Sequence, residues 1–165
     1  MALRARCHQA SHALALSSGL GRSAHDRGSG MSLSNVEIVQ SFYDHFLSGK
    51  VEEGAEKFLA EDFALSNPLP ESIPFGGVYI GPAGFIEYSG KILETLTMEE
   101  FVIEDVISEG DKVVVVGREV SKVHSTGRKY KMPWVHIFRV SAGRILEMRE
   151  FNDTAAMVPA FESNS

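Results

Sequence analysis

His136 and Glu150 lie in the segment 131–153, each at an alternate position of a run whose other alternate positions are mostly apolar. The segment reads KMPWVHIFRV, then SAGR, then ILEMREFND, so two runs of strand composition flank a Ser-Ala-Gly loop. Side chains alternate between the two faces of a strand, and a three-residue loop ending in Gly is a common hairpin closure. This register pairs His136 with Met148 and Trp134 with Glu150. It predicts an imidazole and a carboxylate set diagonally on one otherwise apolar face.

A carboxyl group on such a face suggests proton transfer. Burial disfavours the charged form of Glu and brings its pKa towards neutrality, where it can act as an acid or a base. We therefore predict Glu150 and His136 as catalytic residues, with Glu150 moving a proton next to a carbonyl group and His136 orienting it or polarising the carbonyl oxygen. Trp134, Phe138 and Met148 are expected to line the cavity. A structural interpretation stays open, in which His136 and Glu150 are only a hydrogen-bonded buried pair.

The elements that position this hairpin can be read from periodicity. A capping box formed by Ser34 and Glu37 begins a helix that Gly49 ends, and a second helix is expected over about 51–59. A short strand ends near Asn67, residues 71–80 are expected to form a loop, and Gly81-Pro82 opens a third helix. From about residue 101 onwards the pattern is nearly all strand, before Asp153 caps a final helical turn or two.

Three helices followed by a four-stranded antiparallel meander predict an α+β fold. The helices must cover one face of a strongly curved antiparallel sheet, and Gly117 inside a strand predicts a bulge or bend there. The expected shape is a cone-shaped barrel whose open end holds a small molecule. Two further polar side chains are expected at this cavity: the Tyr43 hydroxyl and the Asn67 amide. Each also has a structural interpretation, in which Tyr43 is core and Asn67 belongs to an Asn-Pro turn.

Composition narrows the functional class. The chain has 165 residues, a formal net charge of −6 and a single cysteine, Cys7. The length suits one domain, and the acidic charge gives no basic footprint for nucleic acid. One cysteine excludes an internal disulfide and a cysteine zinc site. No apolar run is long enough to cross a membrane. We expect no metal and no cofactor, and a small hydrophobic ligand as the binding partner.

Residues 1–30 differ from the rest, with four Arg, five Ser and a single acid. This composition is typical of an organelle transit peptide, but it equally fits a disordered tail or translated sequence upstream of a start at Met31. We therefore expect a tail or leader over 1–30 and one domain over 31–165. The expected location is the cytoplasm, or the mitochondrion or another organelle if residues 1–30 are a transit peptide.

The segment GDKVVVVGREVSKVHSTGRKYKMPWVHIFRVSAGRILEMREFNDTAAM resembles the C-terminal half of the nuclear transport factor 2-like superfamily. More narrowly, it is similar to SnoaL-like polyketide cyclases and ketosteroid-isomerase-related proteins. The helix VEIVQSFYDHFLSGK and the element YIGPAGFIEY fit the same pattern, so the resemblance covers about residues 34–161. It implies the cystatin-like or nuclear transport factor 2-like fold, which hosts isomerases, cyclases, dehydratases, epoxide hydrolases and non-catalytic binders.

The resemblance also implies roles for individual residues. Polyketide cyclases of the superfamily use a His and an acid on the last two strands, at positions that resemble His136 and Glu150. Limonene-type epoxide hydrolases use two acids and an Asn, at places similar to Glu150, Glu119 and Asn67, but the Arg of that family would fall at Gly117. Ketosteroid isomerases place their base near Asn67, and an amide cannot accept a proton there.

The expected function is therefore cofactor-free acid/base catalysis, of the isomerase, cyclase or lyase type, on a small hydrophobic carbonyl compound. The alternatives are a non-catalytic binder or dimeric accessory protein, and an epoxide-hydrolase-like enzyme. Val135 and Ile137 lie on the face opposite the expected cavity, and an outward apolar strip usually meets a partner. Together with the resemblance, this predicts a homodimer through the outer face of the sheet.

Overall fold

The computed structural model describes residues 33–162, and the predictions made for residues 1–30 lie outside this range. Six strands form one sheet in the order β2-β1-β6-β5-β4-β3. The helices are α1 (Asn35–Leu47), α2 (Val51–Phe58), α3 (Gly81–Thr95) and α4 (Thr154–Phe161). The strands are β1 (Leu59–Asn67), β2 (Gly77–Ile80), β3 (Leu96–Glu109), β4 (Lys112–Val123), β5 (Lys129–Ser141) and β6 (Arg144–Asn152).

The predicted α+β class with a curved sheet is confirmed. Strands β3 to β6 form the expected antiparallel meander, and β1 joins β6 in parallel. The sheet does not close, because β2 and β3 are its two edges. Two expectations were incomplete: α4 is a fourth helix after the meander, and part of the expected loop 71–80 is strand β2, which pairs with β1.

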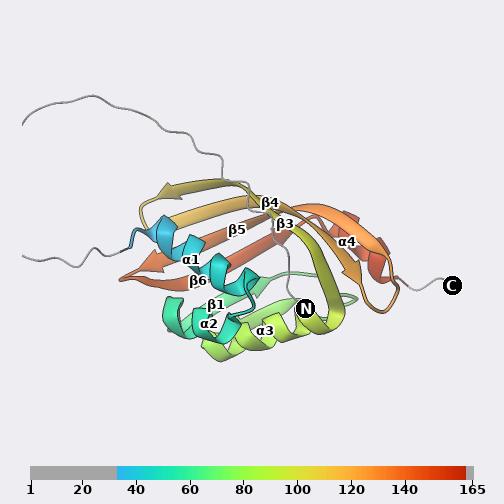
Figure 1. Ribbon diagram of the computed structural model, residues 1–165, viewed down its shortest axis with the longest axis horizontal. Coiled ribbons are helices and arrows are strands. Elements are labelled where there is room, and N and C mark those ends of the chain that lie inside the picture. Colours follow the sequence, from blue (N-terminus) through green and yellow to red (C-terminus); the bar gives the residue numbers. More distant parts are fainter. Residues whose placement is uncertain (1–32, 163–165) are drawn as a thin grey trace, which may run out of the picture.

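The helices pack where their apolar spacing predicts. The Ser34 side chain accepts a hydrogen bond from the Glu37 backbone N–H and the Glu37 carboxylate accepts one from the Ser34 backbone, so the predicted capping box begins α1. Asp153 caps α4 through the Ala156 backbone N–H, as expected. Figure 1 shows α1, α2 and α3 together on one side of the curved sheet and α4 at its far end. Within 33–162 no helix is long and apolar enough to cross a membrane.

The predicted register of the β5–β6 hairpin was wrong. Ser141 pairs with Arg144, so the loop has two residues, Ala142 and Gly143, both with positive φ. This is the backbone conformation that suits a tight hairpin turn. The ladder then shifts by one position on β6, which leaves Leu146 as a bulge.

The bulge restores the inward face that the sequence predicts. His136 lies directly opposite Glu150, not diagonal to it, and Phe138 lies opposite Met148. Because of the bulge, the inward residue near the turn is Ile145, fully buried, in place of Leu146. The register therefore brings the imidazole and the carboxyl group closer together than expected.

Gly117 lies beside an irregularity of the sheet. It pairs with Trp134 on one side and with Ile103 on the other, next to a shift in the β3–β4 register. A Cβ atom at Gly117 would lie 2.3 Å from both the Trp134 ring and the Val102 carbonyl oxygen. Only a residue without a side chain fits beneath this indole. The irregularity is a bulge on the neighbouring strand β3, whereas a bend at Gly117 itself stays a prediction.

Candidate functional site

A cavity lies between the helices and the inner face of the sheet. Six of the predicted site residues line it, and they come from five different elements: Tyr43, Asn67, Glu119, His136, Met148 and Glu150. The structure does not place Trp134 and Phe138 in its lining, although both are buried on the same side of the sheet. The other lining residues are mainly aromatic or apolar: Phe42, Phe46, Phe75, Phe85, Tyr88, Ile92, Leu96, Met98, Phe101, Tyr130, Met132, Asn152 and Met157.

The cavity suits a small and mostly apolar molecule. About 50 Å³ is open to the centres of water-sized molecules, enough for a few waters or a compact ligand. Four lining residues are methionines, whose unbranched side chains adjust to irregular shapes. A larger ligand can therefore be accommodated by rotation of these side chains.

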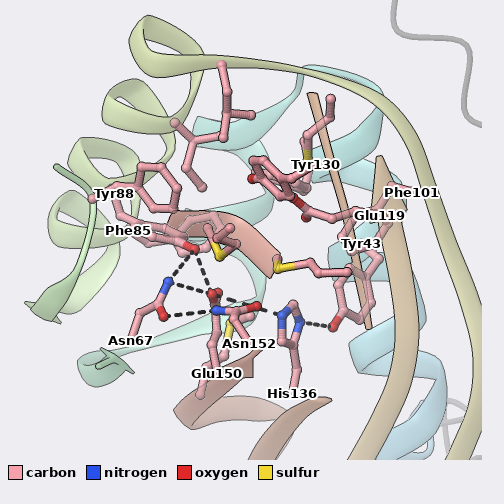
Figure 2. Close-up of a pocket in the computed structure, with 18 of the residues that line it drawn as sticks. Tyr43, Asn67, Phe85, Tyr88, Phe101, Glu119, Tyr130, His136, Glu150 and Asn152 are labelled. Carbon is pink, nitrogen blue, oxygen red and sulfur yellow. Dashed lines mark hydrogen bonds and ion pairs between the residues drawn. The ribbon is translucent and has the colours of Figure 1, made fainter. Parts of the chain in front are cut away.

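Glu150 is anchored through one of its two carboxyl oxygens. Its Oε2 accepts hydrogen bonds from the Tyr88 hydroxyl and the Asn67 amide nitrogen, each at 2.8 Å (Figure 2). The Asn152 amide in turn donates to the Asn67 carbonyl oxygen at 3.1 Å, which fixes the orientation of that amide. Among the described residues, no well-formed hydrogen bond reaches Oε1, although the Asn152 amide lies near enough to lower the Glu150 pKa, and Oε1 is not sealed from the cavity. A proton on Glu150 therefore belongs on Oε1.

The environment of Glu150 raises its pKa from 4.5 to about 7. Burial is the largest cause, because it disfavours the carboxylate. The Tyr88 hydrogen bond opposes this effect, and the negative charge of Glu119 adds to it. At neutral pH the group is thus divided between its acid and base forms, as the sequence predicts for a carboxyl in an apolar cavity.

His136 is neutral at this pH. Burial lowers its pKa from 6.5 to about 3. The Tyr43 hydroxyl lies 2.6 Å from Nδ1, and burial raises the Tyr43 pKa well above 10, so the hydroxyl keeps its proton and donates a hydrogen bond to Nδ1 when that nitrogen is unprotonated. The imidazole proton is then on Nε2, which lies 4.0 Å from Glu150 Oε2. This distance is too long for a hydrogen bond, so the two groups are neighbours and not a sealed pair.

Trp134 supports the imidazole from behind. Its indole ring stacks on His136 with the centroids 4.3 Å apart and on Phe101 with the centroids 4.6 Å apart. Its Nε1–H is buried and is the one buried side-chain polar atom without a partner in the part of the chain that the structure describes. Trp134 therefore fixes the plane of the His136 ring, which is a different role from the cavity wall that the sequence predicts.

Glu119 is a second carboxyl group in the same cavity. Tyr130 and Ser121 both donate to its Oε1, at 2.8 Å and 3.0 Å. Burial raises the Glu119 pKa, and these two hydrogen bonds oppose the rise. Arg118, the next residue, points to the outer face of the sheet, where it forms ion pairs with Glu100 and Glu104.

Several site residues were missed in the sequence. Tyr88 lies on the buried face of α3, one turn after Phe85, and reads as core from its spacing alone. Asn152 and Tyr130 follow the alternation of their strands and fall on the same face as Glu150 and Met132. This alternation could have identified both. No pattern in the sequence shows that the α3 tyrosine reaches the carboxyl group of β6.

No group of three or more His, Cys, Asp or Glu side chains within 33–162 is arranged to hold a metal ion. The chemistry available from the described residues is therefore that of a carboxyl group with a near-neutral pKa, a neutral imidazole and a set of phenolic hydroxyls. These groups can move a proton and hydrogen-bond a carbonyl oxygen.

The family model of the SnoaL-like domain matches residues 39–148, more than half of the chain. The chain belongs to the SnoaL-like family. The matched range includes Tyr43, Asn67 and His136 and ends two residues before Glu150. A search of curated protein sequences found no significant match.

Solved structures agree with this assignment. A nuclear transport factor 2-like protein from Burkholderia xenovorans is 27% identical, with a TM-score of 0.69 over 78% of this chain and 95% of that one. A protein of Mesorhizobium loti described as a SnoaL-like polyketide cyclase is 23% identical, with a TM-score of 0.61 over 72% and 99%. TerC, co-crystallised with polyporic acid, is 26% identical, with a TM-score of 0.65 over 78% and 98%.

Proposed function

We propose that this SnoaL-like protein binds a small, neutral and mostly apolar carbonyl compound and transfers a proton at the carbon next to the carbonyl group. Glu150 is the proton-transfer group. The observation that carries the proposal is the state of Glu150: it is buried at the cavity, held through Oε2 by two donors, and has a pKa of about 7.

The chemical steps follow from these contacts. The carboxylate form of Glu150 accepts the proton from the carbon, and the electron pair of the broken C–H bond moves into the carbonyl group as an enolate. The Nε2–H of His136 donates a hydrogen bond to the enolate oxygen, while Tyr43 holds the ring through Nδ1. Glu150 then returns the proton to the same or another carbon. Isomerisation, cyclisation and elimination all begin with this step.

The cavity supports an apolar substrate, because its walls are mainly aromatic rings and methionines. Two residues near Glu150 favour a neutral substrate: His136 carries no positive charge, and the negative charge of Glu119 would repel an anion. The co-crystallisation of TerC with polyporic acid supports ligand binding by a relative of this fold.

Binding without catalysis is a second candidate. It is favoured by Asn67, an amide where the resemblance to ketosteroid isomerases implies a base. In this case Asn67, Tyr88 and Glu150 only hold a ligand in place. The two candidates differ in one measurable property, which is exchange of the protons next to the carbonyl group of a bound ketone.

Acetophenone in D₂O provides this test, since loss of its methyl signal in proton NMR reports exchange directly. We expect the protein to accelerate the exchange and Glu150→Gln to reduce the rate about 10²–10⁴-fold, the usual contribution of a general acid/base group. His136→Ala should lose less, because it stabilises the enolate and does not transfer the proton. Binding of acetophenone without accelerated exchange would contradict catalysis and support the binding candidate.

A further inference from the structure

We propose that Glu119 is a second ligand contact, which selects carbonyl compounds that carry a hydroxyl group at the end remote from the carbonyl. This inference rests on the proposed function of Glu150 and His136 and extends it to the substrate class. It concerns a residue that the proton-transfer steps do not use.

Glu119 is presented to the cavity in the same way as Glu150. Only 8% of the residue is exposed, and it lines the cavity. Tyr130 and Ser121 both donate to Oε1, whereas Oε2 has no hydrogen-bond partner among the described residues and is not sealed. A carboxyl oxygen that is open to the cavity and has no protein partner is free to form a hydrogen bond with a ligand hydroxyl.

The two carboxyl groups lie on different sides of the cavity. Figure 2 shows Glu119 and Tyr130 on one side and Asn67, Glu150 and His136 on the other. They are close enough for the charge of Glu119 to raise the pKa of Glu150. The cavity lining as a whole is mainly aromatic or apolar, so a ligand with an oxygen function at each end and an apolar body matches the cavity.

A hydroxyl group suits Glu119 in either protonation state. If Glu119 is ionised, Oε2 accepts the hydrogen bond from the hydroxyl. If it is protonated, the proton lies on Oε2, because Oε1 already accepts two hydrogen bonds, and Oε2–H donates to the hydroxyl oxygen. A carboxylate on the ligand would instead meet two acidic side chains.

The test uses two matched pairs of probes, acetophenone with 4-hydroxyacetophenone and 2-acetylnaphthalene with 6-acetyl-2-naphthol. Within each pair only the remote hydroxyl differs, and the two pairs span two lengths. Trp134 is the single tryptophan of the chain and stacks on His136, so its one indole N–H signal in nitrogen-15 NMR reports binding. We expect the hydroxylated member of at least one pair to bind about tenfold more tightly.

Three variants assign the preference to a residue. Glu119→Leu should reduce the preference for the hydroxylated ketone to less than twofold. Glu119→Gln should keep part of the preference, because its amide can still donate and accept hydrogen bonds, and it replaces the Leu variant if that variant does not fold. Glu150→Gln should keep the preference. This inference alone would be overturned if both ketones of each pair bind equally well. It would also be overturned if Glu150→Gln loses the preference while Glu119→Leu retains it. Binding of none of the four ketones would contradict the proposed function itself.

Discussion

Burial acts in opposite directions on the two central residues. It raises the pKa of Glu150 and lowers that of His136, so at pH 7 Glu150 is partly protonated and His136 is uncharged. For Glu150, the folded protein binds the proton more tightly than the unfolded chain, so its stabilising contribution is present at low pH and is lost as pH rises from about 4.5 to about 7. For His136 the contribution is lost as pH falls from 6.5 towards 3.

A single substitution separates the opposing effects of Glu150 and His136 on the pH dependence of stability. In Glu150→Gln the carboxyl group is gone, so the free energy of unfolding of the variant should increase relative to that of the wild type between pH 4.5 and 7. The expected increase is up to about 3 kcal/mol, from the size of the pKa shift. Denaturant melts at several pH values measure it. If the difference in the free energy of unfolding between variant and wild type does not change with pH, Glu150 has the same pKa in the folded protein as in the unfolded chain, which would contradict the raised pKa.

The sequence predicts His136 and Glu150 as site residues, because polar side chains on an apolar strand face are conspicuous. Asn67 was expected from its place at the end of a short strand, and Glu119 from the family resemblance alone. The sequence did not reveal Tyr88, which contacts Glu150 across the cavity from α3. A tyrosine on the apolar face of a helix reads as core. Whether its hydroxyl meets a partner depends on how the helix packs on the sheet, and no local pattern encodes that packing.

At the scale of elements, strands β4 and β5 pack closely at the contact between Gly117 and Trp134, and we expect this contact to set the curvature of the sheet there. Gly117→Ala would place a Cβ atom 2.3 Å from the indole ring and should destabilise the fold by about 1–3 kcal/mol, the usual cost of overpacking. Gly90 in α3 is the matched control, because a Cβ atom there meets nothing within 4 Å. Gly90→Ala should stabilise by up to about 1 kcal/mol. Equal stabilities of the two variants in denaturant melts would contradict this account of the bend.

The β5–β6 hairpin shows why element order was predictable and register was not. A three-residue loop and a two-residue loop followed by a bulge both place His136, Met148 and Glu150 on one face. The apolar pattern therefore could not separate them. Strand β2 escaped prediction for a related reason, since only one of its four residues, Tyr79, is buried.

At the scale of the molecule, the outer face of the sheet carries apolar side chains away from the cavity. Phe151 is 48% exposed and pairs with Val135, and the neighbouring Ile137 is half-buried. We predict a homodimer through this face, measurable by light scattering at micromolar concentration. Ile137→Glu or Phe151→Glu should give monomers, because a charge would be buried at the interface.

Val78→Glu is the control for this prediction, since Val78 is 67% exposed on the edge strand β2, which is separated from β6 by β1. It should leave the dimer intact. A wild-type protein that is monomeric at micromolar concentration would contradict the prediction of a dimer without affecting the assignment of the cavity.

The proposed proton transfer requires Glu150 to be a base at neutral pH, and the pH dependence of acetophenone exchange tests this requirement most directly. We expect the second-order rate constant for exchange, defined for free protein and free ketone, to rise with pH as the carboxylate forms. The midpoint of this rise should lie near pH 7. Tyr88→Phe should move the midpoint to higher pH, because the lost hydrogen bond stabilises the carboxylate. A midpoint near 4.5, or a Glu150→Gln variant that exchanges as fast as the wild type, would contradict the central claim.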